Sequence, residues 1–428
     1  MKYLLSLIIL LQTYLSALSI DEAVKQTIET NPQLEVKKEE LMVEKVLLDG
    51  SKADYLPTID LSYSVGPEVT HTIQNNGTRE NNTHQEAAIN LKQNVFAGLD
   101  TLYKVKQQEA LILSAGSNVQ SSANIISLEV VTEYINILKN KELLNISEEN
   151  MNVHKKYLAQ IKEKLDAGVG RSSDYRQTLS RYENSQSVYF LSKQNYENAI
   201  STFQRILPVE ADAENLVKPV IGELPATTIE DLVDMAFKNN PSIHVSQADI
   251  KYADAALQRS NSNYYPHADI TARAYWNDEL NGVRTDMTDE DGYNVLLVLS
   301  YNLFNGLLDQ SNKEANQHRL LTKRSSLADT KRYIKAYTEI AWRTFNSTKE
   351  QLVHIEKNIE ASAGTVEDYQ KEHELGRRSI IDLLNIELEY NNARNRKVST
   401  EYDRITAYYQ ILTYTGKILE TMDVVIEQ

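Results

Sequence analysis

The sequence predicts an α+β membrane protein in which one unit, made of helices and two strands, occurs twice. Two observations lead to this fold class. The chain has 428 residues but only 14 glycines and 8 prolines, and so few helix-breaking residues predict long uninterrupted elements. The two halves also match each other at an offset of about 208 residues, and an internal repeat constrains the fold before any local pattern does.

The repeat is visible as four short matches that occur in the same order in both halves, each at the boundary of an expected element. We therefore expect repeat 1 at residues 20–207, a linker at 208–228, repeat 2 at 229–418 and a tail at 419–428. The matched pairs are Asn31-Pro32 with Asn240-Pro241, Tyr55-Leu56-Pro57 with Tyr264-Tyr265-Pro266, Val95-Phe96-Ala97-Gly98 with Leu303-Phe304-Asn305-Gly306, and Gly168 and Asp174 with Gly376 and Asp382.

The amino terminus is typical of a cleaved export signal. Lys2 precedes an apolar run from Leu4 to Leu11, and Ala17-Leu18-Ser19 has the small residues that signal peptidase prefers. An uncleaved membrane anchor is the alternative, but this run is too short to cross a bilayer core about 30 Å thick. We expect residues 1–19 to be removed and the mature chain to begin at Ile20.

Composition argues against an enzyme and against a metal or cofactor site. The chain has no cysteine, its eight histidines are scattered, and its formal charge of −15 would repel nucleic acid. Gly168-Val169-Gly170-Arg171-Ser172 lacks the lysine of a phosphate-binding loop, and no Gly-x-Ser-x-Gly sequence occurs. We therefore expect no catalytic residues, no cofactor and no nucleic-acid partner.

Alternating polar and apolar residues predict strands at about 58–66, 85–96, 267–277 and 292–304. In the last strand, Tyr293 and Tyr301 share the apolar face and lie roughly 27 Å apart at about 3.4 Å per residue. This matches the apolar band of an outer-membrane barrel, about 25 Å tall. A strand inside a soluble sandwich is the alternative. The expected membrane-interface aromatics are Tyr293, Tyr301, Trp276 and Tyr63.

Four strands cannot close a barrel, whereas three chains supply twelve, so membrane-spanning strands imply a homotrimer. The helices give a second check. Residues 99–168 form an expected helix of about 105 Å, matched in length by residues 21–54 and 172–207 together. In repeat 2, residues 307–375 match 229–263 and 379–418. Each long helix thus pairs with two short ones as an antiparallel coiled coil.

This organisation resembles the TolC family of outer-membrane factors over essentially the whole mature chain. The most specific residues are Leu375-Gly376-Arg377-Arg378-Ser379-Ile380-Ile381-Asp382-Leu383-Leu384, which are similar to the family's periplasmic turn. The resemblance implies a trimer with a twelve-stranded β-barrel in the outer-membrane lipid and a long periplasmic α-helical barrel. It also implies a periplasmic adaptor and an inner-membrane transporter of the ABC, RND or MFS type. Small-molecule efflux and type I protein secretion both remain open as functions.

The resemblance implies a gate at the turn end of the tunnel. Asp382 matches an acidic ring, and Asn385 occupies the position of a second acid. Arg378 matches a locking arginine with Asp174 as its partner, while His373 replaces the aromatic lock residue. Two alternatives remain: Ser379-x-x-Asp382 is also a helix-capping pattern, and Arg378 and Asp174 are also typical of solvated turn charges.

The hairpin turns are expected near residues 168–173 and 376–379, and the resemblance implies that they contact the adaptor. The turn residues are Gly168, Gly170, Arg171, Gly376 and Arg377. Two functions compete with an export channel. A periplasmic adaptor has one helical hairpin rather than two, and a soluble coiled-coil scaffold would leave the strand after Gly292 without a purpose.

Overall fold

The computed structural model describes residues 18–71, 79–209, 215–280 and 290–426. Most of the expected signal segment, residues 1–17, lies outside the described residues. The chain divides into two compact units. The helical unit contains the described residues up to 37, residues 118–243 and those from 330 onward. The sheet unit contains residues 38–117 and 244–329.

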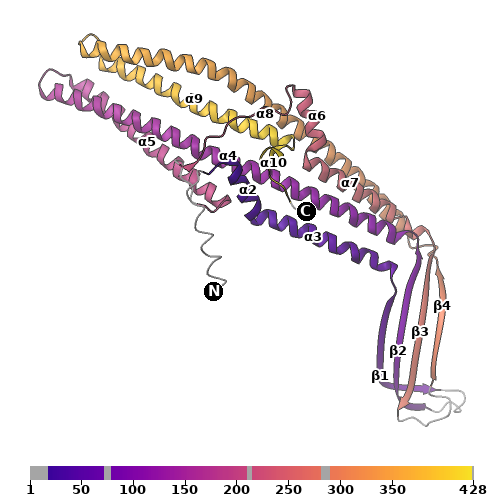
Figure 1. The fold of residues 1–428 in the computed structure, drawn as a ribbon. Coiled ribbons are helices and arrows are strands. Elements are labelled where there is room, and N and C mark those ends of the chain that lie inside the picture. Colours follow the sequence, from indigo (N-terminus) through magenta and orange to yellow (C-terminus); the bar gives the residue numbers. More distant parts are fainter. Residues whose placement is uncertain (1–17, 72–78, 210–214, 281–289, 427–428) are drawn as a thin grey trace, which may run out of the picture. The chain divides into compact units, whose positions relative to one another are not determined.

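In the sheet unit, four strands form one antiparallel sheet in the order β1-β2-β3-β4 (Figure 1), so repeat 1 pairs with repeat 2 through β2 and β3. The hairpin β1–β2 extends further than its apolar alternation suggested, while β4 ends just before Tyr301. The strands are β1 (Thr58–His71), β2 (Arg79–Ala97), β3 (His267–Leu280) and β4 (Glu290–Ser300).

The sheet has one apolar face that crosses all four strands. The register places Leu61, Ile89, Ala274 and Tyr293 in one row, and neighbouring rows on this face are also apolar. Row by row they are Ile59, Leu91, Ala272 and Val295, and then Tyr63, Ala87 and Trp276. The third row ends on Asp291 of β4, and the next row holds Gln85 and Asp278 beside Val65. Because a strand alternates its side chains, this face presents an apolar band suited to lipid, bordered by polar residues.

The opposite face of the sheet is charged and internally paired. Arg273 on β3 pairs with Glu86 on β2, and Lys92 Nζ lies 3.2 Å from Asp269 Oδ2. These pairs join β2 to β3, and hence repeat 1 to repeat 2. A sheet with one apolar and one polar face matches the wall of a water-filled membrane barrel.

Two residues of β2 depart from strict alternation, and each has a local cause. The register shifts between Asn94 and Phe96, which places a bulge at Val95. Gln93 lies on the apolar face, but its Nε2 donates to the carbonyl oxygens of Tyr55 at 3.2 Å and Asn94 at 2.7 Å. The amide is therefore satisfied by backbone at the carboxyl-terminal end of the strand.

The helix expected at residues 21–54 occurs as two helices, α2 (Ile20–Thr30) and α3 (Pro32–Lys52). Pro32 lacks an N–H and suits the first position of a helix, and Asn31 Oδ1 accepts from Gln33 N at 2.9 Å. The same junction recurs in repeat 2 between α6 (Ile229–Asn239) and α7 (Pro241–Arg259). There Asn240 Oδ1 accepts from Ser242 N at 2.9 Å.

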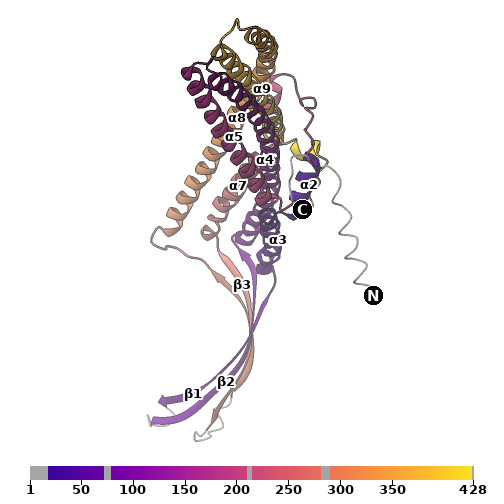
Figure 2. The same cartoon turned by 90° about the vertical axis from the view of Figure 1, so that its left-hand side faces the viewer.

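The remaining helices have the same lengths in both repeats. Each repeat has one helix of 67 residues followed by one of 35 residues, and 67 residues span about 100 Å. They are α4 (Asp100–Asp166) and α5 (Ser172–Ile206), then α8 (Leu308–Glu374) and α9 (Ile380–Tyr414), followed by the short α10 (Ile418–Thr421). Figure 2 shows these helices from a second side.

The junctions from strand to long helix are also repeated in their geometry. Leu99 and Leu307 both have a φ of 69°, a left-handed conformation that costs a non-glycine residue about 1–2 kcal/mol. Because both equivalent positions have this strained conformation, we infer that the junction from strand to long helix requires a left-handed residue. Within the described ranges, no helix has the combined length and apolar character needed to cross a membrane.

Candidate functional site at the hairpin turns

The two hairpin turns have closely similar backbone geometry. In the α8–α9 turn, Gly376 N donates to His373 O at 2.9 Å and Arg377 N donates to Glu372 O at 2.8 Å. This pair of bonds defines a Schellman C-cap, which places glycine in the left-handed region. In the α4–α5 turn, Gly168 N donates to Leu165 O at 2.9 Å, and Val169 N and Gly170 N both donate to Lys164 O.

The residues after each glycine start the returning helix. Arg171 is the residue before α5 and makes no side-chain capping bond. Ser379 occupies this place before α9, and its Oγ accepts from the backbone N–H groups of Ile381 at 3.1 Å and Asp382 at 3.3 Å. The hydroxyl of Ser379 therefore caps α9, and the half-buried Asp382 lies in the first turn.

Arg378 is held by its own hairpin. Its Nε donates to Glu372 Oε2 at 2.8 Å, and its guanidinium lies 4.0 Å from the ring centroid of Tyr369. His373 Nδ1 lies 2.9 Å from Arg378 O. Glu372 is the largest cause that raises the pKa of Arg378, and Tyr369 and Asp382 contribute less. The position expected for a lock is thus a three-residue cluster of Glu372, Arg378 and Tyr369.

Asp174 lies in the first turn of α5, where its Oδ1 accepts from Ser173 Oγ at 3.2 Å. Within the described residues of this single chain, Arg378 pairs with Glu372 and makes no ion pair with Asp174. The Arg378–Asp174 lock therefore stays a prediction.

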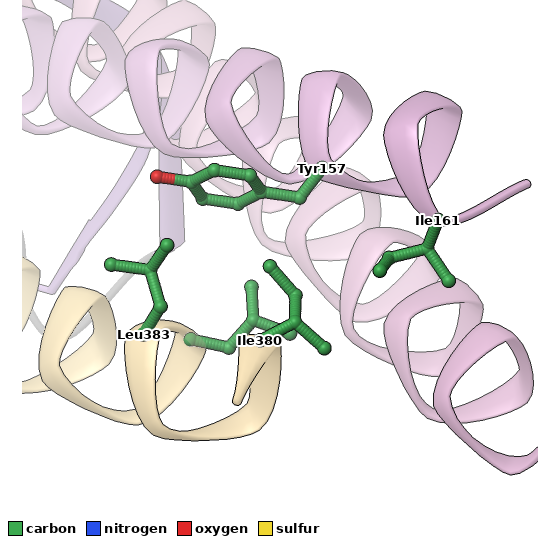
Figure 3. Close-up of a cluster of buried hydrophobic side chains, with 5 residues drawn as sticks. Tyr157, Ile161, Ile380 and Leu383 are labelled. Atoms are coloured by element: carbon green, nitrogen blue, oxygen red, sulfur yellow. The ribbon is translucent and has the colours of Figure 1, made fainter. Parts of the chain in front are cut away.

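An apolar cluster packs α4 of the first hairpin against α9 of the second, near the two turns (Figure 3). Tyr157 and Ile161 come from α4, and Ile380, Leu383 and Leu384 come from α9. All five side chains are at most 6% exposed. Apolar burial of this kind fixes the two hairpins of one protomer in register.

A buried carboxyl group lies beside this cluster. Glu387 on α9 is 5% exposed, and its Oε1 accepts from Tyr157 OH at 3.4 Å. Gln370 Nε2 on α8 donates to Tyr157 OH at 3.1 Å. Burial raises the pKa of Glu387 above its usual value, while the hydrogen bonds and the charge of Arg394 oppose that rise. Burial also raises the pKa of Tyr157 to about 12.

A second polar contact joins the two hairpins. Arg181 Nη2 on α5 donates to Asn385 Oδ1 on α9 at 3.2 Å. Asn385 lies at one end of a groove of about 680 Å³ along α9. The groove carries mostly polar side chains from successive turns, namely Asn385, Leu388, Glu389, Asn392, Asn395, Arg396, Ser399 and Thr400.

Sequence reasoning found the turns but missed several partners in them. Glu372 is six residues before Arg378, a spacing that no regular helix brings together, so only the turn geometry places them in contact. Arg181 follows Asp174 by seven residues, which puts both on one face of α5. This seven-residue spacing from Asp174 could have identified Arg181 as a candidate site residue.

The aromatic residues expected at the membrane interface are solvent-exposed in the single chain. Tyr293 is 84% exposed, Tyr63 62%, Tyr301 55% and Trp276 46%. Tyr63 OH also donates to Gln85 Oε1 at 3.0 Å. In the part of the chain that the structure describes, no three histidine, aspartate or glutamate side chains gather as metal ligands would.

Comparison with known families gives the same twofold division. Residues 23–207 and residues 232–417 each match the model of the outer membrane efflux protein family. The chain belongs to this family. Membership confirms the expected resemblance, the presence of two repeats and an outer-membrane location with a large periplasmic helical part. It decides for an export channel over a periplasmic adaptor or a soluble scaffold.

Curated relatives are distant but extend over most of the chain. The outer membrane efflux protein BepC of Brucella suis is 18% identical, covering 86% of this chain and 78% of BepC. The alkaline protease secretion protein AprF of Pseudomonas aeruginosa is 19% identical, covering 96% of this chain and 87% of AprF. TolC of Escherichia coli is 19% identical, covering 91% of this chain and 80% of TolC.

Solved structures show the same fold at still lower identity. The outer-membrane channel OprN superposes with a TM-score of 0.83 at 16% identity, covering 93% of this chain and 90% of OprN. The CmeC channel of Campylobacter jejuni gives 0.82 at 13% identity, covering 93% of this chain and 86% of CmeC. The predicted fold class, strands and long helices of an outer-membrane channel, is confirmed.

Proposed function

We propose that three copies of this chain form one passive exit duct, with a twelve-stranded barrel in the outer membrane and a helical tunnel in the periplasm. The observation that carries this proposal is the four-stranded sheet, which is apolar across one face and ends in the edge strands β1 and β4. An open edge cannot remain unpaired in lipid. Pairing β4 of one copy with β1 of the next removes every edge and leaves the polar face toward the lumen.

Energy and cargo come from partners in this proposal. An inner-membrane transporter of the ABC, RND or MFS type supplies substrate, and a periplasmic adaptor docks at the hairpin turns around Gly170, Arg171 and Arg377. The names of the relatives include both efflux and protease secretion, so the transporter rather than this chain selects the cargo. A pull-down that identifies the transporter would name the cargo class, and capture of no transporter at all would count against the tripartite arrangement.

At the turn end, Asp382 supplies the acidic ring of the constriction. Three carboxylates near one axis repel one another and attract cations, which makes the ring a charge filter. Arg378 has two competing partners in this scheme: Glu372 within its own hairpin, at 2.8 Å, and Asp174 across hairpins. Once the guanidinium of Arg378 is released from Glu372, it can pair with Asp174.

Channel activity is tested by reconstituting the purified protein in planar bilayers and by cell fractionation. We expect recovery in the outer membrane and discrete conductance steps. Recovery in the periplasmic supernatant, without conductance, would contradict the channel.

The gate is tested by substitutions that separate charge from capping. We expect Asp382→Ala to abolish block by multivalent cations and Arg378→Ser to raise conductance. Ser379→Ala removes the helix cap at a cost of about 1 kcal/mol and should leave cation block intact. Equal block in Asp382→Ala and in the unaltered channel would reduce Asp382 to a helix-end residue.

A further inference from the structure

Arg181 connects the two hairpins of a protomer at the level of the constriction. It lies on α5, seven residues after Asp174, and therefore on the same face of that helix two turns further on. Its Nη2 donates to Asn385 Oδ1 on α9 at 3.2 Å. Asn385 in turn follows Asp382 by three residues, or one helical turn. Arg181 thus carries a positive charge to a point one turn beyond the acidic ring.

In the described part of the chain, Arg181 forms no ion pair. Among the residues that the structure describes, no carboxylate oxygen lies within 4.0 Å of its guanidinium, and its hydrogen-bond partner, Asn385, is neutral. The field of Arg181 extends to the neighbouring α4. There burial, and then the charge of Arg181, lower the pKa of His154.

The position of Asn385, the partner of Arg181, is fixed by its surroundings. Leu383 and Leu384, which precede Asn385, are each 1% exposed and belong to the apolar cluster with Tyr157 and Ile161. This cluster holds α4 against α9 (Figure 3), and Tyr175 of α5 packs against it. Asn385 therefore cannot move far from α5 without exposing buried side chains. A single hydrogen bond between two side chains therefore has a defined geometry here.

We propose that Arg181 is a specificity-determining residue of the channel constriction. It holds Asn385 and sets one positive charge per protomer beside the ring of Asp382 carboxylates. The constriction then has a negative layer followed by a positive one, which weakens cation binding and favours passage of cargo that carries both signs of charge. This proposal rests on the proposed function, in which Asp382 lines the constriction.

Four proteins test the proposal: the unaltered channel, Arg181→Gln, Asn385→Asp and the double variant. In planar bilayers, block by lanthanum ions reports the negative field of the constriction. We expect Asn385→Asp to change block little because Arg181 neutralises the new carboxylate. The double variant should bind lanthanum about tenfold more tightly than Asn385→Asp, a difference of about 1.4 kcal/mol, because the new carboxylate no longer has a positive charge beside it.

The matched control is Arg176→Gln, which removes the same charge from an exposed position of α5 and should leave lanthanum block unchanged. Equal block in Asn385→Asp and the double variant would overturn the proposal, as would equal effects of Arg181→Gln and Arg176→Gln. If Asn385→Asp fails to assemble, lanthanum block of Arg181→Lys, which keeps the positive charge, decides between the outcomes. Block equal to that of the unaltered channel supports the proposal. Block equal to that of Arg181→Gln overturns it. Absence of conductance in the unaltered protein would instead refute the proposed function.

Discussion

Nε of Arg378 donates to Oε2 of Glu372 at 2.8 Å, so the two ends of the α8–α9 turn are joined by an ion pair within one hairpin. We expect Glu372→Gln to release the guanidinium and make it available to Asp174, which would lower single-channel conductance. Adding Asp174→Asn should restore conductance. Glu163→Gln, which removes an exposed acid near the other turn, serves as the control. Unchanged conductance in Glu372→Gln would show that the ion pair does not restrain Arg378.

The two faces of β4 should respond oppositely to charge. Leu297 lies on the apolar face and is 71% exposed, whereas its neighbour Leu296 is 53% exposed on the opposite face. We expect Leu297→Arg to destabilise the membrane-inserted protein by about 2–4 kcal/mol if it lies near the bilayer midplane. Leu296→Arg should be tolerated because it faces the polar side. Recovery of folded protein from the outer membrane is the measurement, and equal loss in both variants would contradict the assignment of the faces.

The buried carboxyl of Glu387 should make stability depend on pH. Its pKa in the folded protein is raised above the usual 4.5, chiefly by burial. The stability that its protonated form contributes is therefore fully present below about pH 4.5 and is lost as the pH rises through the raised pKa. We expect Glu387→Gln to stabilise the protein at pH 7 by on the order of 1 kcal/mol and to have no effect at pH 4. Thermal unfolding at both pH values tests this, and stabilisation of equal size at both would contradict it.

The sequence predicted the repeats, the strands and the long helices because each has a signal of regular spacing. In the sequence the Asn-Pro pairs mark the repeat, but only the fold shows their structural role. Asn31 closes one helix and caps the next, so a pattern that looked like one helix is two. Asn240 also donates through Nδ2 to Tyr414 O at 2.9 Å, a contact 174 residues away that no local pattern encodes.

The contacts of the candidate site were less predictable because they depend on the folded chain and not on a local sequence pattern. Gly376 and Ser379 were found because turn and cap chemistry is local. The contacts of Arg378 with Glu372 and of Arg181 with Asn385 depend on how the chain reverses and how two hairpins pack. A charged residue near a turn has several acids within reach in the sequence, and only the packed structure selects one.

Two glycines with the same backbone conformation should differ in their tolerance of a side chain. Gly376 and Gly416 have φ values of 71° and 69°, so alanine at either position incurs about 1–2 kcal/mol of backbone strain. A Cβ at Gly376 would meet nothing within 4 Å, but at Gly416 it would lie 2.6 Å from the backbone oxygen of Asn239. We therefore expect Gly416→Ala to separate the end of α9 from α6 and to lower the unfolding temperature well beyond the effect of Gly376→Ala. Because the clash is with backbone, no change of rotamer relieves it, and equal unfolding temperatures in the two variants would mean that α6 yields at little cost.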